Sequence, residues 1–248
     1  MTEPLYHTDA YLKEFEATVV AVEGSAIALD RTAFYPGGGG QPNDVGAVTV
    51  GERSWPVTKV RKTRPDAKRA EGAGDHIWHE FAPAGEPPPV GAVVHGVIDW
   101  ERRYKLMRTH TAMHILCGVI FRDYGASVTG GNMEPLKGRM DFEFETMRHE
   151  LVREIEEKIN VEVAAARPTR VKILPRAEAF AIPDLIRTKI NLLPEGIAEV
   201  RTVEIVGLDL QADGGTHVAN TSEVGKIRVA DYKSKGKINK RIEIEIDG

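Results

Sequence analysis

Short apolar runs separated by turn residues fill the first hundred positions of the chain. Residues 15–22 are rich in β-branched side chains, and Glu-Gly-Ser at 23–25 supplies a turn before the next run. The pattern returns in segments 26–29, 45–50, 55–60 and 90–98. Regularly spaced short strands are typical of small barrels and sandwiches. The pattern therefore predicts a small β-barrel-like domain over residues 1–100.

A long helix is expected directly after this domain. Asp99 is a residue type that favours helix N-caps, and Gly125 marks the end of the segment that begins there. Four apolar side chains are available for a stripe that faces a core: Tyr104, Met107, Leu116 and Ile120. The pattern predicts one helix from Asp99 to about Tyr124.

The remainder of the chain mixes helical and extended segments. A second helix is predicted after Thr146, where Leu151, Ile155 and Ile159 recur every four residues, and a short helix over residues 176–186. Extended segments are predicted over 171–174 and 198–210, at the end of 133–144, and in a hairpin of 226–232 with 238–246. Residues 101–248 are therefore predicted to form a second domain, and the chain is assigned to the α+β class.

Composition narrows the class of protein only a little. The chain has 248 residues and a formal net charge of −4, which gives no whole-protein signature of nucleic-acid binding. Cys117 is the only cysteine, so an internal disulfide is excluded. No stretch approaches the roughly 18 apolar residues of a membrane span, and residues 1–10 lack the pattern of a secretory signal. These features predict a cytoplasmic protein with no membrane partner.

Two histidines on the predicted long helix are the first candidates for chemistry. His110 and His114 are four residues apart, so they lie one above the other on the same helix face and can bind one metal ion. A packed pair of histidines has the same spacing. Thr111 stands where the H-E-x-x-H motif of metalloproteases has its glutamate, which argues against a protease.

Two glycine-rich segments supply further candidates. His217 follows Gly214 and Gly215 at the end of a predicted extended segment, and paired glycines let a substrate approach the backbone closely. A surface turn has the same composition. The other segment, TAFYPGGGGQPNDVG at residues 32–46, has four consecutive glycines but lacks the Lys and Ser/Thr of a phosphate-binding P-loop.

Three motifs, in this order, make the chain similar to the editing portion of alanyl-tRNA synthetases and especially to the free-standing alanyl-tRNA editing proteins (the AlaX group). They are TAFYPGGGGQP, RTHTAMH at residues 108–114 and GGTHV at residues 214–218. The resemblance covers nearly the whole chain. It implies a barrel-like N-terminal domain followed by an α+β editing domain of the kind shared by threonyl- and alanyl-tRNA synthetases.

The resemblance also implies a zinc site. His110, His114 and His217 match the family's three histidine ligands, whereas Asp213 replaces the family's cysteine ligand four residues before the last histidine. Three accounts of the fourth position stay open. Asp213 binds zinc through oxygen, Asp213 hydrogen-bonds a water on the metal, or Cys117 on the helix substitutes.

The activity implied by the resemblance is hydrolysis of the ester that joins a wrong amino acid to the 3′ end of tRNA(Ala). Serine is the expected amino acid and glycine a second one. Thr129 resembles the family threonine that contacts the serine hydroxyl, and Gln41, Gly214 and Gly215 are further candidates for contacts to the substrate. Two alternatives are a non-catalytic tRNA-binding module with a degraded metal site, and a zinc hydrolase of this fold that acts on small esters or amides.

Two basic runs are candidates for contacts to tRNA phosphates. The candidate side chains are Lys59, Arg61, Lys62 and Arg64 in the first run, and Lys235 and Lys237 near the terminal hairpin. Solvated loop charges balanced by nearby acidic residues are the alternative for either run.

Overall fold

The computed structural model describes residues 1–63, 75–82, 86–144, 146–188, 193 and 196–248. The chain divides into two units. Met1–Gly38 and Pro42–Arg103 form the first, and Gly39–Gln41 with Tyr104–Gly248 form the second. Three residues of the glycine-rich loop therefore pack with the second unit. The predicted α+β class is confirmed.

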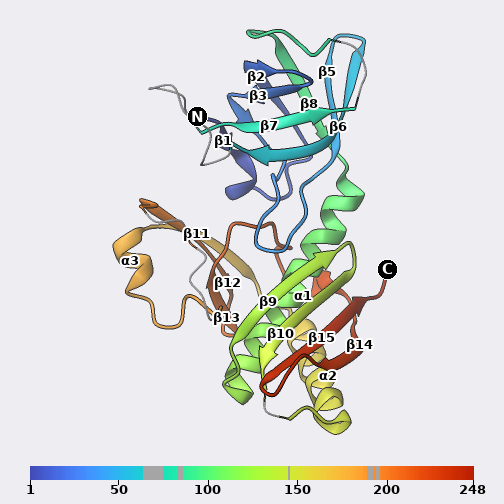
Figure 1. Ribbon diagram of the computed structural model, residues 1–248, viewed down its shortest axis with the longest axis vertical. Helices are drawn as coiled ribbons and strands as arrows, with labels where there is room; N and C mark the ends of the chain where they lie inside the picture. The colour runs from blue at the N-terminus through green and yellow to red at the C-terminus, as the bar shows by residue number, and fades with distance from the viewer. Residues whose placement is uncertain (64–74, 83–85, 145, 189–192, 194–195) are drawn as a thin grey trace. The chain divides into compact units, whose positions relative to one another are not determined.

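The first unit contains a closed six-stranded antiparallel barrel with the strand order β2-β3-β7-β6-β5-β8 (Figure 1). Its strands are β2 (Glu14–Glu23), β3 (Ala26–Leu29), β5 (Gly46–Val50), β6 (Arg53–Lys62), β7 (Ile77–Phe81) and β8 (Val93–Ile98). The 3-10 helix η1 (Leu5–His7) precedes it, and two short strands, β1 (Glu3–Pro4) and β4 (Arg31–Thr32), pair in parallel. Alternating side chains such as Val48, Trp55 and Val57 fill the barrel core. The predicted barrel is confirmed, with β7 as a strand that the pattern did not reveal.

A buried ion pair anchors the segment that follows the short strand β4. The side chains of Arg103 and Asp44 are 0% and 1% exposed, and Arg103 donates hydrogen bonds to both oxygens of the Asp44 carboxylate. Arg103 also donates to the carbonyl groups of Ala10 and Ala33, and Asp44 accepts from the backbone N–H of Tyr35 at 2.6 Å. The ends of the glycine-rich loop are therefore tied to the start of the long helix within the first unit.

That helix, α1 (Trp100–Tyr124), runs on as the central element of the second unit. Asp99 caps it, because one of its carboxylate oxygens accepts a hydrogen bond from the backbone N–H of Arg102 at 3.1 Å. Every residue from 109 to 120 is buried, so this part of α1 is enclosed on all sides and not only along the predicted stripe. Gly118 permits close packing, since a Cβ there would lie 2.9 Å from Leu208 and 3.0 Å from Asp209.

Two antiparallel sheets, two further α-helices and one 3-10 helix make up the rest of the second unit in the described part of the chain. The first sheet has the order β14-β15-β10-β9 and the second β11-β12-β13 (Figure 1). The bounds are β9 (Val128–Glu134), β10 (Lys137–Glu143), α2 (His149–Ala164), β11 (Thr169–Pro175), α3 (Arg176–Phe180), β12 (Glu199–Ile205), β13 (Asp209–Ala212), η2 (Thr221–Val224), β14 (Ile227–Ser234) and β15 (Asn239–Ile246). No helix in the described part of the chain is both long and apolar enough to cross a membrane.

The terminal hairpin and the helix α2 are confirmed, and three details differ from the sequence prediction. The single extended segment over residues 198–210 is wrong, because a turn at Gly207, with φ of +76°, separates β12 from β13. The helix predicted over residues 176–186 ends at Phe180, three residues before Pro183. The strand β9 was not predicted, since its glycines have the composition of a loop.

Candidate metal centre

The two helix histidines lie side by side in the interior of the second unit. His110 and His114 are 4% and 7% exposed, and their ring centroids are 5.0 Å apart. The four-residue spacing on α1 places both rings on one face, as expected for a helix. The burial of α1 on all sides keeps both imidazoles away from bulk water.

His217 and Asp213 come from the loop that follows β13. The His217 ring stacks on His110 with centroids 4.1 Å apart and lies 4.6 Å from His114. Asp213 accepts a hydrogen bond from the backbone N–H of Gly215 at 2.8 Å, and the Asp213 carbonyl accepts from Arg201 Nη1 at 2.9 Å. The loop is therefore held in a conformation that turns both side chains toward α1.

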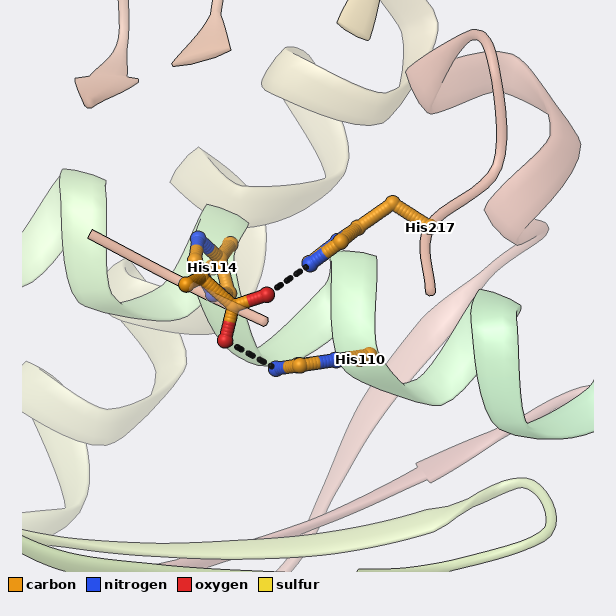
Figure 2. A group of neighbouring side chains, drawn as sticks. His110, His114 and His217 are labelled. Atoms are coloured by element: carbon orange, nitrogen blue, oxygen red, sulfur yellow. Dashed lines mark hydrogen bonds and ion pairs between the residues drawn. The ribbon is translucent and has the colours of Figure 1, made fainter. Parts of the chain in front are cut away.

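Figure 2 shows the three histidine rings around one carboxylate, that of Asp213. Asp213 Oδ2 is 3.0 Å from His217 Nε2, and Asp213 Oδ1 is 3.6 Å from His110 Nε2. One ligand atom from each of His110, His114, Asp213 and His217 lies within 4.8 Å of the others. Three imidazole nitrogens and one carboxylate oxygen form a donor set that suits zinc and other divalent transition metals.

Each histidine is oriented through its other ring nitrogen. His110 Nδ1 is 2.9 Å from Gln41 Oε1, His114 Nδ1 is 3.0 Å from Asp209 Oδ2, and His217 Nδ1 is 3.2 Å from Thr111 Oγ1. Gln41 Oε1 and Asp209 can only accept, so His110 and His114 donate from Nδ1 and keep the Nε2 lone pair free for a metal. The donor set thus fits a metal ion in orientation as well as in composition.

Burial dominates the electrostatics of the cluster. It lowers the pKa of His110 well below the usual range and the pKa of His217 to about 4. Burial also acts on His114, but the hydrogen bond and charge of Asp209 outweigh it and raise that pKa. The nearby histidines hold the pKa of Asp213 well below its ordinary value despite its burial. At neutral pH the cluster therefore offers neutral His110 and His217 beside an ionised Asp213.

Gln41 and Gly215 lie beside this cluster, but both already contact other protein atoms there. Gln41 Nε2 donates to Thr216 Oγ1 at 2.8 Å, while its Oε1 contacts His110 and accepts from the backbone N–H of Thr216. A Cβ on Gly215 would collide with His110 and Gln41, whereas none of the neighbouring atoms lies within 4 Å of a Cβ on Gly214. Of these three candidates, Gly214 alone is left exposed.

Thr129 and Cys117 are placed differently from the sequence expectation. Thr129 is exposed on β9, and its hydroxyl donates to Asn239 Oδ1 at 2.8 Å, so its contact to a serine hydroxyl stays a prediction. Cys117 is not part of the metal-binding group formed by the described residues. Its buried Sγ accepts a hydrogen bond from Gln211, and burial raises the pKa of its thiol well above the usual range. A protonated, buried thiol is a poor zinc ligand.

The candidate tRNA-binding side chains differ in how far they are neutralised. Lys59 and Arg61 on β6 both form ion pairs with Glu80 on β7, at 3.8 and 2.6 Å. Lys62 is exposed, and Arg64 lies outside the described residues. Lys235 and Lys237 are exposed around the turn between β14 and β15. The second run therefore presents its charge to solvent more openly than Lys59 and Arg61 do.

Sequence reasoning missed Asp209 and Thr111, which hold two of the three histidines. The sequence identifies Thr111 only as the residue that replaces a protease glutamate. Asp209 had a detectable signal, because Asp209, Gln211 and Asp213 alternate in the sequence and therefore share one face of an extended strand. In the structure Gln211 Nε2 donates to Asp209 Oδ2 at 2.7 Å.

Comparisons with known proteins agree with the motifs. A family model described as "Threonyl and Alanyl tRNA synthetase second additional domain" matches residues 200–243, and one described as "tRNA synthetases class II (A)" matches residues 7–102. The chain is 42% identical over 246 residues to the alanyl-tRNA editing protein AlaX-M of Saccharolobus solfataricus, covering 98% of each chain. It is 42% identical over 247 residues to AlaX-M of Methanosarcina mazei, covering 98% of this chain and 95% of the relative. The alanine–tRNA ligase of Ignicoccus hospitalis is 39% identical over 234 residues, which are 92% of this chain and 24% of the ligase.

Proposed function

The chain belongs to the family of AlaX-M alanyl-tRNA editing proteins, and on this premise we propose that it hydrolyses tRNA(Ala) that carries a wrong amino acid. The ester between the amino acid and the tRNA 3′ end is the bond that breaks. Serine and glycine are the amino acids removed. The observation that supports this proposal is the convergence of three histidine ring nitrogens and one carboxylate oxygen in a mostly buried group. A tRNA substrate also implies a cytoplasmic protein.

His110, His114, His217 and Asp213 are the residues that would hold zinc. When bound, zinc supplies a Lewis acid that makes an ester carbonyl or a water molecule more reactive. The lowered pKa values of His110 and His217 keep both imidazoles neutral at neutral pH. This favours metal binding, because neither histidine has to release a proton first. Asp213 offers the negative charge that a cysteine thiolate would otherwise bring. Its backbone carbonyl and carboxylate are both held by protein donors, which keeps the carboxylate aimed at the histidines.

The approach to Asp213 is bordered by residues without side chains. Gly39 and Gly214 are both exposed, and a Cβ on Gly39 would lie 3.8 Å from Asp213 Oδ1. Gly40 lies close to the backbone of Gly131, since a Cβ there would be 3.1 Å from the Gly131 carbonyl oxygen. Glycine backbones at these positions leave room for a small amino acid near the metal-binding group. Serine and glycine are small enough for this space, but alanine lies between them in size, so the sparing of Ala-tRNA(Ala) requires contacts that distinguish more than size.

Lys235 and Lys237 are the side chains that we assign to tRNA phosphates in the second unit. Both are exposed, and phosphate contacts of this kind make binding weaken as salt rises. Lys59 and Arg61 are weaker candidates because Glu80 neutralises them. Replacing both Lys235 and Lys237 by Ala should therefore reduce the salt dependence of tRNA binding, whereas Lys59→Ala should change it less.

The test compares deacylation of Ser-tRNA(Ala), Gly-tRNA(Ala) and correctly charged Ala-tRNA(Ala), with and without a chelator. Loss of serine or glycine that the chelator abolishes and zinc restores supports the proposal, provided that Ala-tRNA(Ala) is spared. His110→Ala and His114→Ala should each remove the metal and the activity. Salt-sensitive tRNA binding without hydrolysis would favour a non-catalytic binding module. Hydrolysis of small esters but not of aminoacyl-tRNA would favour a zinc hydrolase of this fold that acts on small esters or amides.

A further inference from the structure

Asp209 is a buried carboxylate that contacts Nδ1 of His114, the ring nitrogen that faces away from the metal-binding group. It is the first residue of β13, and its side chain is 0% exposed. Its Oδ2 lies 3.0 Å from His114 Nδ1 and 2.7 Å from Gln211 Nε2. A carboxylate buried this deeply is costly unless its partners compensate for the lost hydration. The partners of Asp209 must therefore compensate for the hydration that its carboxylate loses on burial.

These partners hold the carboxylate against the histidine. Gln211, two residues along β13 and on the same face, donates to the oxygen that also faces His114. Arg187 Nε lies 3.6 Å from the other oxygen, and its guanidinium lies over the ring of Phe121 at 3.6 Å. Arg187 thus brings positive charge to Asp209 Oδ1, while His114 and Gln211 share Oδ2.

Close packing of α1 on the turn before β13 makes this contact possible. Gly118, one helical turn after His114, leaves room for Leu208 and Asp209, because a Cβ there would be 3.0 Å from Asp209 Cβ. A larger residue at 118 would push β13 away from the helix. The distance between Asp209 and His114 is therefore fixed by the fold itself.

We propose that Asp209 is a positioning residue for the metal: it fixes the ring orientation of His114, keeps the Nε2 lone pair turned into the cluster and strengthens metal binding. The proposal rests on the metal-dependent function proposed above. At Nδ1, His110 and His217 have the neutral partners Gln41 and Thr111, whereas the Nδ1 partner of His114 is a carboxylate. A carboxylate partner raises the basicity of the imidazole, so the ring binds a metal more strongly than one whose partner is an amide or a hydroxyl. Asp209 therefore sets the affinity of the site without touching the metal or the substrate.

Asp209→Asn is the decisive variant, because asparagine has the same shape but lacks the charge and has only one accepting oxygen. Removal of such a partner weakens metal binding by about 10- to 100-fold. The zinc dissociation constant is measured by competition with a chromophoric chelator, and the visible absorption bands of the cobalt-substituted protein report the geometry at the metal. We expect weaker zinc binding, altered cobalt bands, and deacylation that is lost at limiting zinc and recovered in excess zinc.

Two further variants keep the result interpretable. Asp231→Asn replaces an exposed aspartate on β14 and should leave zinc affinity and the cobalt spectrum unchanged. Gln211→Met removes a donor to Asp209 without altering a histidine partner, so it should weaken zinc binding in the same direction but less. Thermal unfolding of the metal-free protein shows whether Asp209→Asn folds. If it does not, the zinc affinity of Gln211→Met tests the role of Asp209 instead.

An Asp209→Asn protein that folds and binds zinc and cobalt as the wild type does would overturn the inference while leaving the proposed function intact. If Asp209→Asn does not fold, unchanged zinc affinity in Gln211→Met would overturn it equally. Failure of the proposed function looks different, because the wild-type protein itself would then bind no metal or deacylate without it. In that case the inference about Asp209 falls too.

Discussion

The backbone of Gly215 lies so close to the ring of His110 that a Cβ atom at residue 215 would be 2.3 Å from His110 Cε1 and 2.5 Å from His110 Nδ1. The side-chain oxygen of Gln41 would be 2.7 Å from the same atom. His110 is fixed by α1 and by its hydrogen bond to Gln41, so it has little freedom to withdraw. The second glycine of the GGTHV motif is therefore required by a metal-ligand candidate 105 positions earlier in the chain.

Gly215→Ala is expected to displace His110 or Gln41 and to weaken zinc binding. Overpacking a filled site costs about 1–3 kcal/mol, which corresponds to about a 5- to 150-fold loss of affinity. Gly214→Ala is the matched control for metal binding, because among the described residues other than its chain neighbours no atom would lie within 4 Å of its Cβ. Zinc content after dialysis and chelator competition check both variants. Equal zinc affinity in the two proteins would contradict the packing argument.

Replacing Asp213 tests whether its carboxylate is the fourth protein ligand. Asp213→Ala removes a donor atom and a negative charge from the group, so zinc affinity should fall by at least tenfold. Asp213→Cys should retain or tighten zinc binding, because a thiolate is a strong zinc ligand at a similar position. Inductively coupled plasma measurement of bound zinc, followed by chelator competition, gives both values. Unchanged zinc affinity in Asp213→Ala would leave Asp213 only a role as hydrogen-bond partner of a water.

The histidine candidates could be predicted from the sequence because their geometry is local or carried by motifs. A four-residue spacing on one long helix places His110 and His114 on the same face whatever the rest of the fold does. His217 and Asp213 required the resemblance, since residues a hundred positions away on another element have no local signal that joins them to the helix. The barrel and the terminal hairpin could also be predicted from a local signal, the short apolar runs and the alternation of apolar and polar residues along the strands.

The residues that orient the histidines could not be predicted because they depend on how elements pack. Asp209 meets His114 only because α1 and β13 approach closely at Gly118, and Thr111 meets His217 only because the loop after β13 returns to the helix. Gln41 was expected to contact substrate, and its packing against His110 and Thr216 depends on three loop residues joining the second unit. Strand β9 was missed because the glycines at 130 and 131 have low strand propensity, and pairing with β10 overrides it.

Arg103→Met is expected to destabilise the first unit strongly. The change leaves the Asp44 carboxylate buried without its ion-pair partner, which typically costs about 3–5 kcal/mol of unfolding free energy. Tryptophan fluorescence during urea unfolding is a suitable measurement, because Trp55, Trp78 and Trp100 all belong to the first unit. Arg31→Met, at an exposed position on β4, serves as the control and should stay within about 0.5 kcal/mol of the wild type. Similar losses in both variants would argue against a structural role for the buried pair.

His79 predicts how the stability of the barrel depends on pH. It is fully buried on β7, its Nε2 is 2.8 Å from Thr32 Oγ1, and burial lowers its pKa to about 4. In the unfolded chain its pKa is about 6.5. Above pH 6.5 neither state is protonated and the contribution is fully present. As the pH falls from 6.5 to 4, the unfolded chain takes up a proton that the folded barrel excludes, so stability falls by about 1.4 kcal/mol per pH unit.

His79→Gln removes this titration while its amide can still reach the Thr32 hydroxyl. Between pH 7 and pH 5 the wild type should lose about 2 kcal/mol more unfolding free energy than the variant, from the 1.5 pH units below 6.5 at about 1.4 kcal/mol each. Urea unfolding of the metal-free proteins, followed by tryptophan fluorescence, measures this difference at the two pH values. The histidines of the metal-binding group are present in both proteins, so their titration cancels in the comparison. Parallel losses of stability in the two proteins would mean that His79 takes up its proton in the folded barrel, and that burial does not lower its pKa.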